Sequence, residues 1–373
     1  MWSPLRVIHC STTHAAYRLG FSGQPKPVLG RLRYNWVWRC GSNRAEEPMA
    51  PRASVHKVEL DMDVTSREDV LAHLVKNVLF RKGPLIALNK PIGLPLHDME
   101  DDQVNVTSLL NDLAHMLSAS PDLHIVKSAP KEQSGVLLLS ECYENSQKLQ
   151  VAFKQARKQR QLLHTYWAVV IGIPNPPEGH ISIALSEQLI GSHRLMVPVM
   201  KPSKGNLLKK EARKTYSSYQ VRQEGKGYCL LEMSPLTAQK HQLQVHVTKL
   251  LCAVLGDRMY GGRVRNILGH STPIDPEIAL QTPQELPPAM LSRLSKRPGP
   301  NCHIPLHLHL FSLSLPSIPS RQKGHHITEY DGEVIKAPPP AYFLQTLRLL
   351  GLAKGIPEVQ GLQAKKNQRI DLS

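Results

Sequence analysis

The 373-residue sequence lacks several features that would place it in a common class of protein. No apolar run reaches about 18 residues, the length that a membrane-spanning helix needs. The six cysteines are scattered, and no two of them form a C-x-x-C pair. This pattern argues against a zinc ribbon or a disulfide framework and fits a reducing compartment. We therefore expect no membrane span, no zinc ribbon and no disulfide framework.

Acidic residues are absent before Glu46, while arginines recur through the same stretch. An Arg-rich, acid-free leader is typical of a mitochondrial transit peptide, and it predicts delivery to the mitochondrial matrix. A basic arm that stays attached and contacts RNA is the alternative. We predict a disordered transit peptide at 1–45, a linker at 46–65, a folded domain at 66–352 and a disordered basic tail at 353–373.

The chain carries 46 Lys and Arg against 30 Asp and Glu, a formal net charge of +16. This surplus indicates a polyanionic partner, most simply nucleic acid, although part of it lies in the leader. Residues 190–216 form the densest basic stretch of the predicted domain, which we interpret as a flexible loop that contacts the RNA backbone. A solvated loop is the alternative. The residues that we assign to this contact are Lys201, Lys204, Lys209, Lys210, Arg213 and Lys214.

Hydrophobic periodicity predicts both helices and strands in the domain. Helices are expected at 66–80, 106–117, 145–160 and 338–352, and strands at 84–90, 162–172, 228–233 and 304–316. The helix at 145–160 has a basic face that either contacts phosphates or is simply solvated. The last strand carries His307 and His309, but no Asp, Glu or further Cys clusters near them. We therefore expect no metal site.

Three stretches combine polar residues with the ends of apolar strands. The first, 84–97, is a short strand followed by a loop of Lys, Pro and Gly. The second, 125–140, reads IVKSAPKEQSGVLLLS and is a polar turn before a buried strand. The third spans 234–262. Polar residues beside a buried strand suit chemistry, because the scaffold behind them is rigid.

Together these stretches resemble the motifs of the RluA-type RNA pseudouridine synthases. In the first motif the matching residues are Asn89, Lys90, Pro91, Gly93, Leu94, Pro95 and His97. In the second they are Lys131, Ser134 and Gly135, and in the 162–172 strand Tyr166, Ala168 and Gly172. In the third they are Pro235, Thr237, His241, Gln242, Leu243, His246, Gly256, Asp257, Tyr260 and Gly261. The degenerate second motif and the leader together resemble the mitochondrial RNA pseudouridylate synthase domain-containing proteins.

The resemblance implies an α+β pseudouridine synthase fold, with a mixed, mainly antiparallel sheet and flanking helices around an RNA cleft. It implies no cofactor. It places Tyr166 against the target base, where the family's Tyr is thought to move a proton during the isomerisation. The motif residues that we assign to RNA binding are Lys90, His97, Lys131, His241, Gln242 and Gln244.

Five positions depart from the family pattern. Ser128 and Gln239 stand where the family has an Arg, and His164 stands where it has a Lys. The other two departures concern the reaction itself. The nucleophilic Asp of the family falls on Pro130, and the Arg that pairs with it falls on Gln244. Their joint loss is physically coherent, because a buried Arg without its carboxylate is costly. Glu132 is the nearest acid and a weak substitute, since small misplacements are costly in catalysis. An Asp at position 130 alone is therefore not expected to restore activity.

Two functions remain open on the sequence. In the first, the chain converts uridine to pseudouridine in mitochondrial mRNA or rRNA, using Glu132 or an acid from a partner. In the second, a catalytically inactive synthase fold binds RNA or assists mitochondrial ribosome assembly without chemistry. Mitochondrial RNA is the expected partner in both, with ribosome assembly or RNA-processing proteins as further partners.

Overall fold

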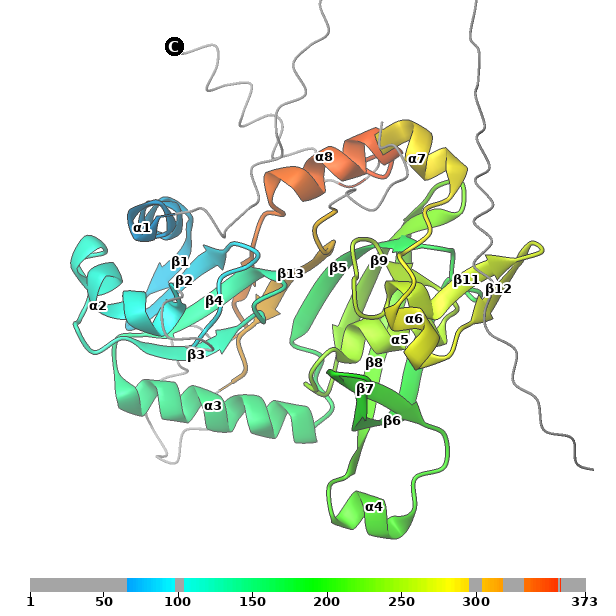
Figure 1. The fold of residues 1–373 in the computed structure, drawn as a ribbon. Coiled ribbons are helices and arrows are strands. Elements are labelled where there is room, and N and C mark those ends of the chain that lie inside the picture. The colour runs from blue at the N-terminus through cyan, green and yellow to red at the C-terminus, as the bar shows by residue number, and fades with distance from the viewer. Residues whose placement is uncertain (1–65, 98–103, 295–303, 318–331, 355, 357–373) are drawn as a thin grey trace, which may run out of the picture. The chain divides into compact units, whose positions relative to one another are not determined.

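One large mixed sheet draws its strands from most of the chain that the structure describes (Figure 1). The structure is a computed structural model that describes residues 66–97, 104–294, 304–317, 332–354 and 356. The strands of the sheet are β1 (Val78–Lys82), β2 (Leu85–Lys90), β3 (His124–Ser128), β4 (Ser134–Ser140), β5 (His164–Ile171), β6 (Glu178–Ile190), β7 (His193–Val199), β8 (Ala212–Glu224), β9 (Tyr228–Pro235), β10 (Ala253–Val254), β13 (Leu308–Ser314) and β14 (Val334–Lys336).

Within the described residues the spatial order of this sheet is β1-β2-β4-β13-β5-β9-β8-β6-β7. Three short strands lie off this path, where β3 pairs with β4, β10 with β5 and β14 with β13. A separate two-stranded sheet joins β11 (Val264–Ile267) and β12 (His270–Pro273). The helices are α1 (Arg67–Lys76), α2 (Val106–Met116), α3 (Tyr143–Lys158), α4 (Lys204–Leu208), α5 (Gln242–Lys249), α6 (Pro276–Leu280), α7 (Pro288–Leu294) and α8 (Ala341–Leu350).

A short parallel contact between β4 and β13 joins the two halves of the sheet, while the neighbouring pairs β2–β4 and β13–β5 are antiparallel. The contact pairs His309 with Ser134 and Leu310 with Gly135. Gly135 has φ +126°, and a Cβ there would overlap the carbonyl oxygen of Leu310. Glycine is therefore required for this approach of the two backbones. The mixed, mainly antiparallel sheet with flanking helices confirms the predicted α+β class.

Helices cover both faces of β2 and β4, which explains their unbroken apolar runs. Leu85 and Ala87 point to one face, where they pack with Phe153 of α3. Ile86 and Leu88 point to the other face, where they pack with apolar residues of α1 and α2. Alternate residues of a strand face opposite sides, so two-sided burial requires apolar residues at every position.

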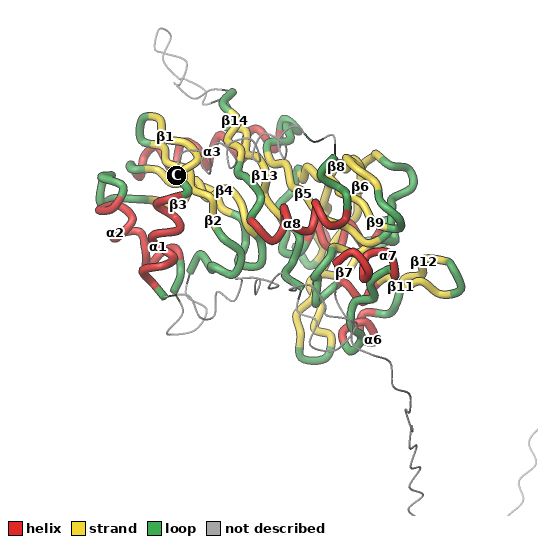
Figure 2. The backbone as a smooth tube through the Cα atoms, turned by 90° about the horizontal axis from the view of Figure 1, so that it is seen from above, coloured by secondary structure: helices red, strands yellow, loops and turns green. Residues whose placement is uncertain are grey.

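The other half of the sheet is covered by α8, which crosses above β13 and β5 (Figure 2). Trp167 of β5 stacks on Phe311 of β13 with ring centroids 3.9 Å apart, and Phe343 of α8 belongs to the same apolar cluster. Ile356 is also buried in this cluster. The packed region therefore continues beyond the boundary at residue 352 that the sequence predicted.

The first helix is shorter than predicted. Ser66 caps α1 as expected, because its side chain accepts a hydrogen bond from the backbone N–H of Asp69. The helix ends at Lys76, whereas the prediction extended it to residue 80. Residues 78–82 instead form β1 against β2. Their β-branched and aromatic side chains suit an edge strand, and pairing with β2 overrides the local helical periodicity.

The basic stretch at 190–216 is largely regular structure, which corrects the prediction of a flexible loop. β6 and β7 form a hairpin, and β8 pairs with the other edge of β6. α4 lies at the far end of this arm (Figure 1). We call residues 190–216 the basic arm. Because regular structure holds its backbone, its basic side chains form a fixed surface and not a mobile loop.

Several predicted regions lie outside the described residues. These are the transit peptide at 1–45, the linker at 46–65 and residues 357–373 of the tail. Among the helices of the described chain, none has the length and apolar character that crossing a membrane requires.

Candidate active site

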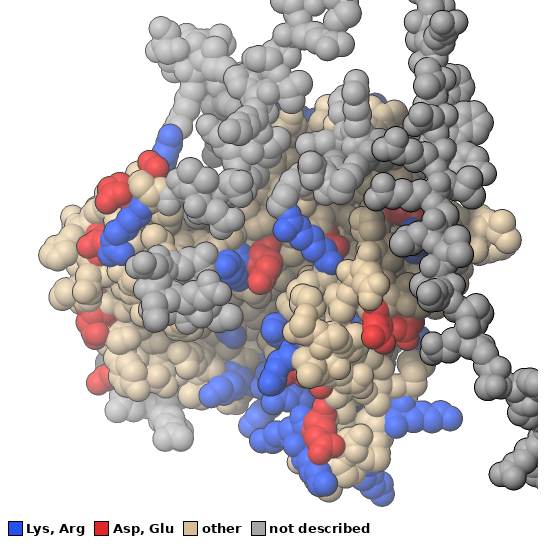
Figure 3. All heavy atoms as spheres, viewed as in Figure 1, with Lys and Arg blue, Asp and Glu red and all other residues tan. Residues whose placement is uncertain are grey.

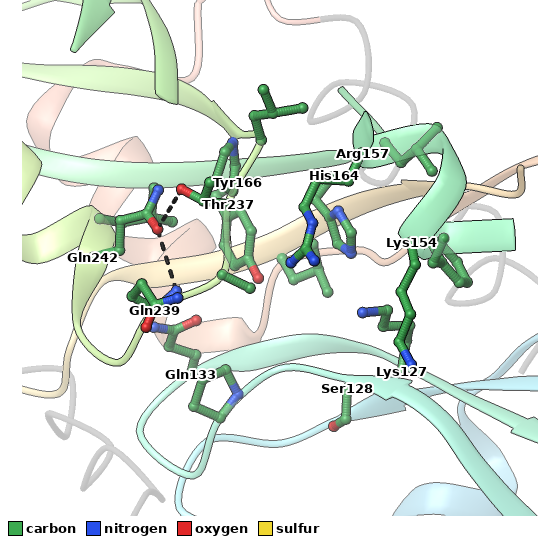
Figure 4. Close-up of a pocket in the computed structure, with 18 of the residues that line it drawn as sticks. Lys127, Ser128, Gln133, Lys154, Arg157, His164, Tyr166, Thr237, Gln239 and Gln242 are labelled. Carbon is green, nitrogen blue, oxygen red and sulfur yellow. Dashed lines mark hydrogen bonds between the residues drawn. The ribbon is translucent and has the colours of Figure 1, made fainter. Parts of the chain in front are cut away.

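A cavity of about 470 Å³ brings together residues from β3, α3, β5, β9, α5 and β13 and from the three loops that join β3 to β4, α3 to β5 and β9 to α5 (Figure 4). β3 and α3 place Lys127, Lys154 and Arg157 on one wall. The loop between β9 and α5 places Thr237 and Gln239 on the opposite wall. A cavity of this size lies within the usual range of ligand sites.

Tyr166 faces this cavity from β5, with Leu310 and Met233 as its neighbours across the sheet. No described residue hydrogen-bonds its hydroxyl group. Burial raises the pKa of Tyr166, so the phenol stays neutral at physiological pH. A neutral phenol can stack against a base and exchange a proton with it. The catalytic role of Tyr166 stays a prediction.

Pro130 lines the same cavity, and none of the described lining residues is an Asp or a Glu. Glu132 is exposed and is not part of the lining. Burial and the charge of Lys240 lower the pKa of His241, whereas the charge of Glu132 raises it. The carboxylate of Glu132 therefore lies close enough to act on His241, which lines the cavity. The described cavity has room for a base but no carboxylate on its wall.

Lys90 is not available to RNA phosphates, which corrects the assignment made from its motif. Its side chain is fully buried. Its Nζ donates hydrogen bonds to the carbonyl oxygens of Pro91 at 3.0 Å, Leu94 at 3.1 Å and Gln133 at 2.8 Å. These bonds use every N–H of the ammonium group. Burial lowers the pKa of Lys90 to about 7. Lys90 therefore ties the loop after β2 to the loop before β4.

Gln242 also has a structural role instead of the predicted contact with RNA. Its Oε1 accepts hydrogen bonds from the Thr237 hydroxyl at 2.9 Å and the Gln239 backbone N–H at 3.2 Å. Its Nε2 donates to the Tyr216 carbonyl oxygen at 3.2 Å and to the Ser217 hydroxyl at 3.0 Å. The amide has no capacity left for RNA. It holds the loop between β9 and α5 against β8.

Gln244 is buried outside the cavity lining, so the prediction that it binds RNA is wrong as well. Its side chain hydrogen-bonds Asp257. Burial raises the pKa of Asp257 to about 6, although hydrogen bonds from the backbone N–H groups of Tyr260 and Met259 and from Gln244 oppose that rise. The structure therefore does not bring Gln244 to the cavity that Pro130 lines.

The remaining residues that the sequence assigned to RNA are exposed or partly buried. His97 is exposed, with Nδ1 2.9 Å from the Thr107 hydroxyl, and Lys131 is partly buried. The assigned basic residues of the arm are all exposed, and Lys and Arg side chains gather around α4 (Figure 3). Arg213 also reaches Oε1 of Gln239 at 3.2 Å. Their contacts with RNA stay predictions.

Sequence reasoning missed much of the cavity lining, including the polar residues Lys127, Gln133 and His164. Lys127 and Gln133 enter it from either side of Pro130, and His164 enters from the start of β5. Burial and the charge of Lys127 lower the pKa of His164 to about 4, so its imidazole is neutral. The resemblance offered one signal, because His164 stands where the family has a Lys. Lys127 carries no signal of its own, because its role depends on its distance from α3.

His307 and His309 are buried and hydrogen-bonded within the fold. His309 lies between the Ser134 hydroxyl, 2.8 Å from Nδ1, and the Ala337 carbonyl oxygen, 3.0 Å from Nε2. His307 Nε2 lies 2.8 Å from the Thr346 hydroxyl. Within the described ranges, no group of three or more His, Cys, Asp or Glu side chains could hold a metal ion.

Comparison with known proteins identifies the family of this chain. Residues 84–249 match the family model described as RNA pseudouridylate synthase. The human mitochondrial mRNA pseudouridine synthase RPUSD3 is 38% identical over 288 residues, which cover 77% of this chain and 79% of that protein. This chain belongs to the RNA pseudouridine synthase family. Mouse mitochondrial pseudouridylate synthase RPUSD4 is 30% identical over 298 residues, covering 76% of this chain and 72% of that protein.

A solved structure of a pseudouridine synthase supports the fold. Human RNA Pseudouridylate Synthase Domain Containing 4 superposes with a TM-score of 0.56 and 24% identity, covering 75% of this chain and 95% of that one. This likeness supports the pseudouridine synthase fold of the chain.

Proposed function

We propose that this chain acts in the mitochondrial matrix on mRNA or rRNA, where it converts uridine to pseudouridine. Membership of the pseudouridine synthase family and the mitochondrial names of its relatives support the proposal. The observation that carries it is the cavity with Tyr166 on its wall. The acid-free leader supports the location.

Isomerisation requires access to both the sugar and the base of the target nucleotide. A base inside a helix is inaccessible, so enzymes that act on it extrude the nucleotide into a pocket. The cavity is large enough for one such nucleotide, and the ring of Tyr166 offers a surface for its base. The exposed basic arm would hold the RNA backbone on either side of the extruded nucleotide.

The reaction in this family needs a carboxylate, and the described cavity lining does not supply one. Breaking the glycosidic bond in this family uses an acid at the sugar or base, and a proline cannot replace it. Glu132 is two residues from Pro130, and its charge acts on His241. In this proposal, Glu132 or an acid from a partner protein reaches the nucleotide when RNA is bound.

The test incubates the purified full-length chain with mitochondrial RNA and maps pseudouridine. Product is expected from the wild-type chain, and Glu132→Ala and Tyr166→Phe are each expected to lower its rate by several powers of ten. Tyr166→Phe removes a hydroxyl that no described residue hydrogen-bonds, so the variant should fold normally. Product formation that neither substitution changes would remove both residues from the mechanism.

RNA binding without isomerisation is the second candidate function, and the absence of a carboxylate from the described lining favours it. In this version the chain holds RNA or assists mitochondrial ribosome assembly or RNA processing. It predicts salt-sensitive RNA binding with no product from the isolated chain. Pro130→Asp should not create activity, because Gln244 hydrogen-bonds Asp257 outside the cavity and supplies no cation to the new carboxylate. Turnover by the unaltered isolated chain would exclude this version.

A further inference from the structure

The cavity has two chemically different ends, with Tyr166 between them (Figure 4). The cationic end consists of Lys127 from β3 and of Lys154 and Arg157 from α3. Lys154 and Arg157 lie three residues apart, so they project from the same face of the helix. Lys158, also on α3 and also exposed, is not part of the lining. The orientation of α3 thus directs two of its basic residues into the cavity.

The cationic end has no acidic counter-charge in the described structure. No described Asp or Glu forms an ion pair with Lys127, Lys154 or Arg157, and none lines the cavity. Burial lowers the pKa of Lys127, and the charges of Arg157 and Lys154 lower it further, so the three cations repel one another. The Nζ of Lys127 also lies 5.1 Å from the ring centroid of Phe153, and this cation–π contact holds the ammonium group beside α3. Binding of an anion would relieve this repulsion.

The opposite end is lined by the amide side chains of Gln133 and Gln239. Gln133 is 7% exposed, and no described residue hydrogen-bonds its side chain. Its amide lies on the same side of the cavity as Gln239 (Figure 4). A free carboxamide offers both a donor and an acceptor, which complement the carbonyl oxygens and the N3–H of uracil. The amide atoms of Gln133 are not among the fully buried unpartnered polar atoms of the described structure, so a ligand in the cavity can reach them.

We propose that the cationic end is a phosphate subsite that takes a phosphate attached to the extruded nucleotide, while the Gln133 end takes its base. The proposal rests on the proposed function and adds the orientation of the nucleotide in the cavity. Arg157 can bind two phosphate oxygens at once, and the two lysines act as point charges. Tyr166 then lies between the two ends, with its ring against the base and near the glycosidic bond.

The first experiment measures binding of uridine and of its 5′- and 3′-monophosphates to the full-length chain by calorimetry. At least one monophosphate is expected to bind about tenfold or more tightly than uridine, the effect of one charge-assisted hydrogen bond. Arg157→Gln and Lys154→Gln should each remove most of this advantage without weakening uridine binding. Gln133→Leu should weaken uridine and the monophosphates by the same factor.

Lys158→Gln is the matched control, because it removes the same charge from the same helix outside the cavity. It should leave the advantage of the monophosphate unchanged. Equal binding of uridine and both monophosphates, or equal losses in the Arg157→Gln and Lys158→Gln variants, would overturn the phosphate subsite. Since Lys154, Arg157 and Lys158 are all exposed, their substitution should not disturb folding.

A second experiment distinguishes an RNA phosphate from that of a free nucleotide. Short uridine-containing RNAs carry one uncharged methylphosphonate linkage, either 5′ or 3′ of the target uridine. One of the two methylphosphonate RNAs should bind the wild-type chain less tightly than the unmodified RNA does. The Arg157→Gln variant should bind that methylphosphonate RNA and the unmodified RNA equally. Nucleotide discrimination without any methylphosphonate effect would assign the subsite to free nucleotides. If the wild-type chain binds RNA but shows neither the monophosphate preference nor the methylphosphonate effect, the phosphate subsite is overturned and the proposed function stands. If the wild-type chain binds no RNA at all, the proposed function is overturned.

Discussion

The hydroxyl oxygen of Tyr260 lies 3.0 Å from Nδ1 of His241, and it accepts a hydrogen bond from the backbone N–H of Met196 at 2.9 Å. Tyr260 is buried, and no other described residue can accept its hydroxyl hydrogen. That hydrogen must therefore be donated to Nδ1, since an unpaired buried hydroxyl is costly. His241 is thereby held neutral, with its remaining N–H at Nε2. His241 lines the cavity, and Nε2 has no described partner, so this N–H is free for a ligand.

Tyr260→Phe should raise the pKa of His241 towards its ordinary value. A hydrogen bond to the neutral imidazole favours that form, and burial and Lys240 already hold the pKa of His241 below 6.5. The titration of the His241 ring protons by NMR would measure the change. Tyr228→Phe is the control, because its buried hydroxyl bonds Leu350 and not a histidine. The same shift in both variants would exclude the proposed hydrogen bond to Nδ1.

Stability should fall as the pH falls from 7 towards 4, and His309 should contribute to that loss. Burial lowers the pKa of His309 from 6.5 to about 4 in the folded chain. Between these values the unfolded chain binds more protons, so acid favours unfolding, and above 6.5 this effect vanishes. His309→Asn should therefore reduce the stability difference between pH 7 and pH 5 by on the order of 1–2 kcal/mol. Urea unfolding at both pH values measures it.

The control for this experiment is His180→Asn on the exposed part of β6. It should leave the pH dependence unchanged. His164, His246 and His307 also have pKa values lowered to about 4 by burial, so the His309 variant should keep part of its acid sensitivity. A variant whose pH dependence equals that of the wild-type chain would contradict the buried, neutral state of His309.

Motif spacing identified the loops of the site but not the direction of each side chain. Lys90 and Gln242 stand in matching motifs, yet both are buried and bonded to backbone or side chains of the fold. A sequence shows that a polar residue is present, while burial depends on elements far apart in the chain. Lys127 was missed for the same reason, because its neighbour Arg157 belongs to a helix thirty positions later in the chain.

The fold was predictable where local and tertiary preferences agree. Ser66 was recognised as a helix cap, and the apolar run of β4 was recognised as a buried strand. The prediction failed for β1 and β7, where local signals disagreed with strand pairing. Residues 78–80 continued a helical pattern, and the charges around β7 suggested a loop. Both segments are strands because a neighbouring strand satisfies their backbone groups.

Gln242→Leu should destabilise the chain and collapse the loop between β9 and α5. The substitution removes four hydrogen bonds, and it leaves the Gln239 N–H and the Ser217 hydroxyl without their partner. The Thr237 hydroxyl and the Tyr216 carbonyl keep other bonds. We expect a loss of roughly 3 kcal/mol or more in the free energy of unfolding. Denaturant unfolding followed by fluorescence would measure it.

Gln161→Leu is the matched control for Gln242→Leu. Gln161 also lines the cavity, but it is exposed. Its substitution should change the free energy of unfolding by no more than about 0.5 kcal/mol. Similar stability in the two variants would show that the hydrogen bonds of Gln242 do not hold the loop.

The basic arm should contribute to RNA affinity through charge alone. Lys204, Lys209 and Lys210 are exposed around α4, and none forms an ion pair with a described acid. Replacing all three with Gln should weaken binding to RNAs of different sequence by similar factors. For every phosphate that the variant no longer neutralises, the slope of log affinity against log salt should fall by about 0.7, the value for single strands.

Lys76→Gln supplies the comparison for the arm, because Lys76 is exposed on α1 in another part of the fold. It should leave both the affinity and the salt slope nearly unchanged. The measurement is a filter-binding titration of two unrelated RNAs at several salt concentrations. If the triple variant kept the wild-type slope, the arm would not contact the backbone. If it lost affinity for only one of the two RNAs, the arm would read sequence instead of charge.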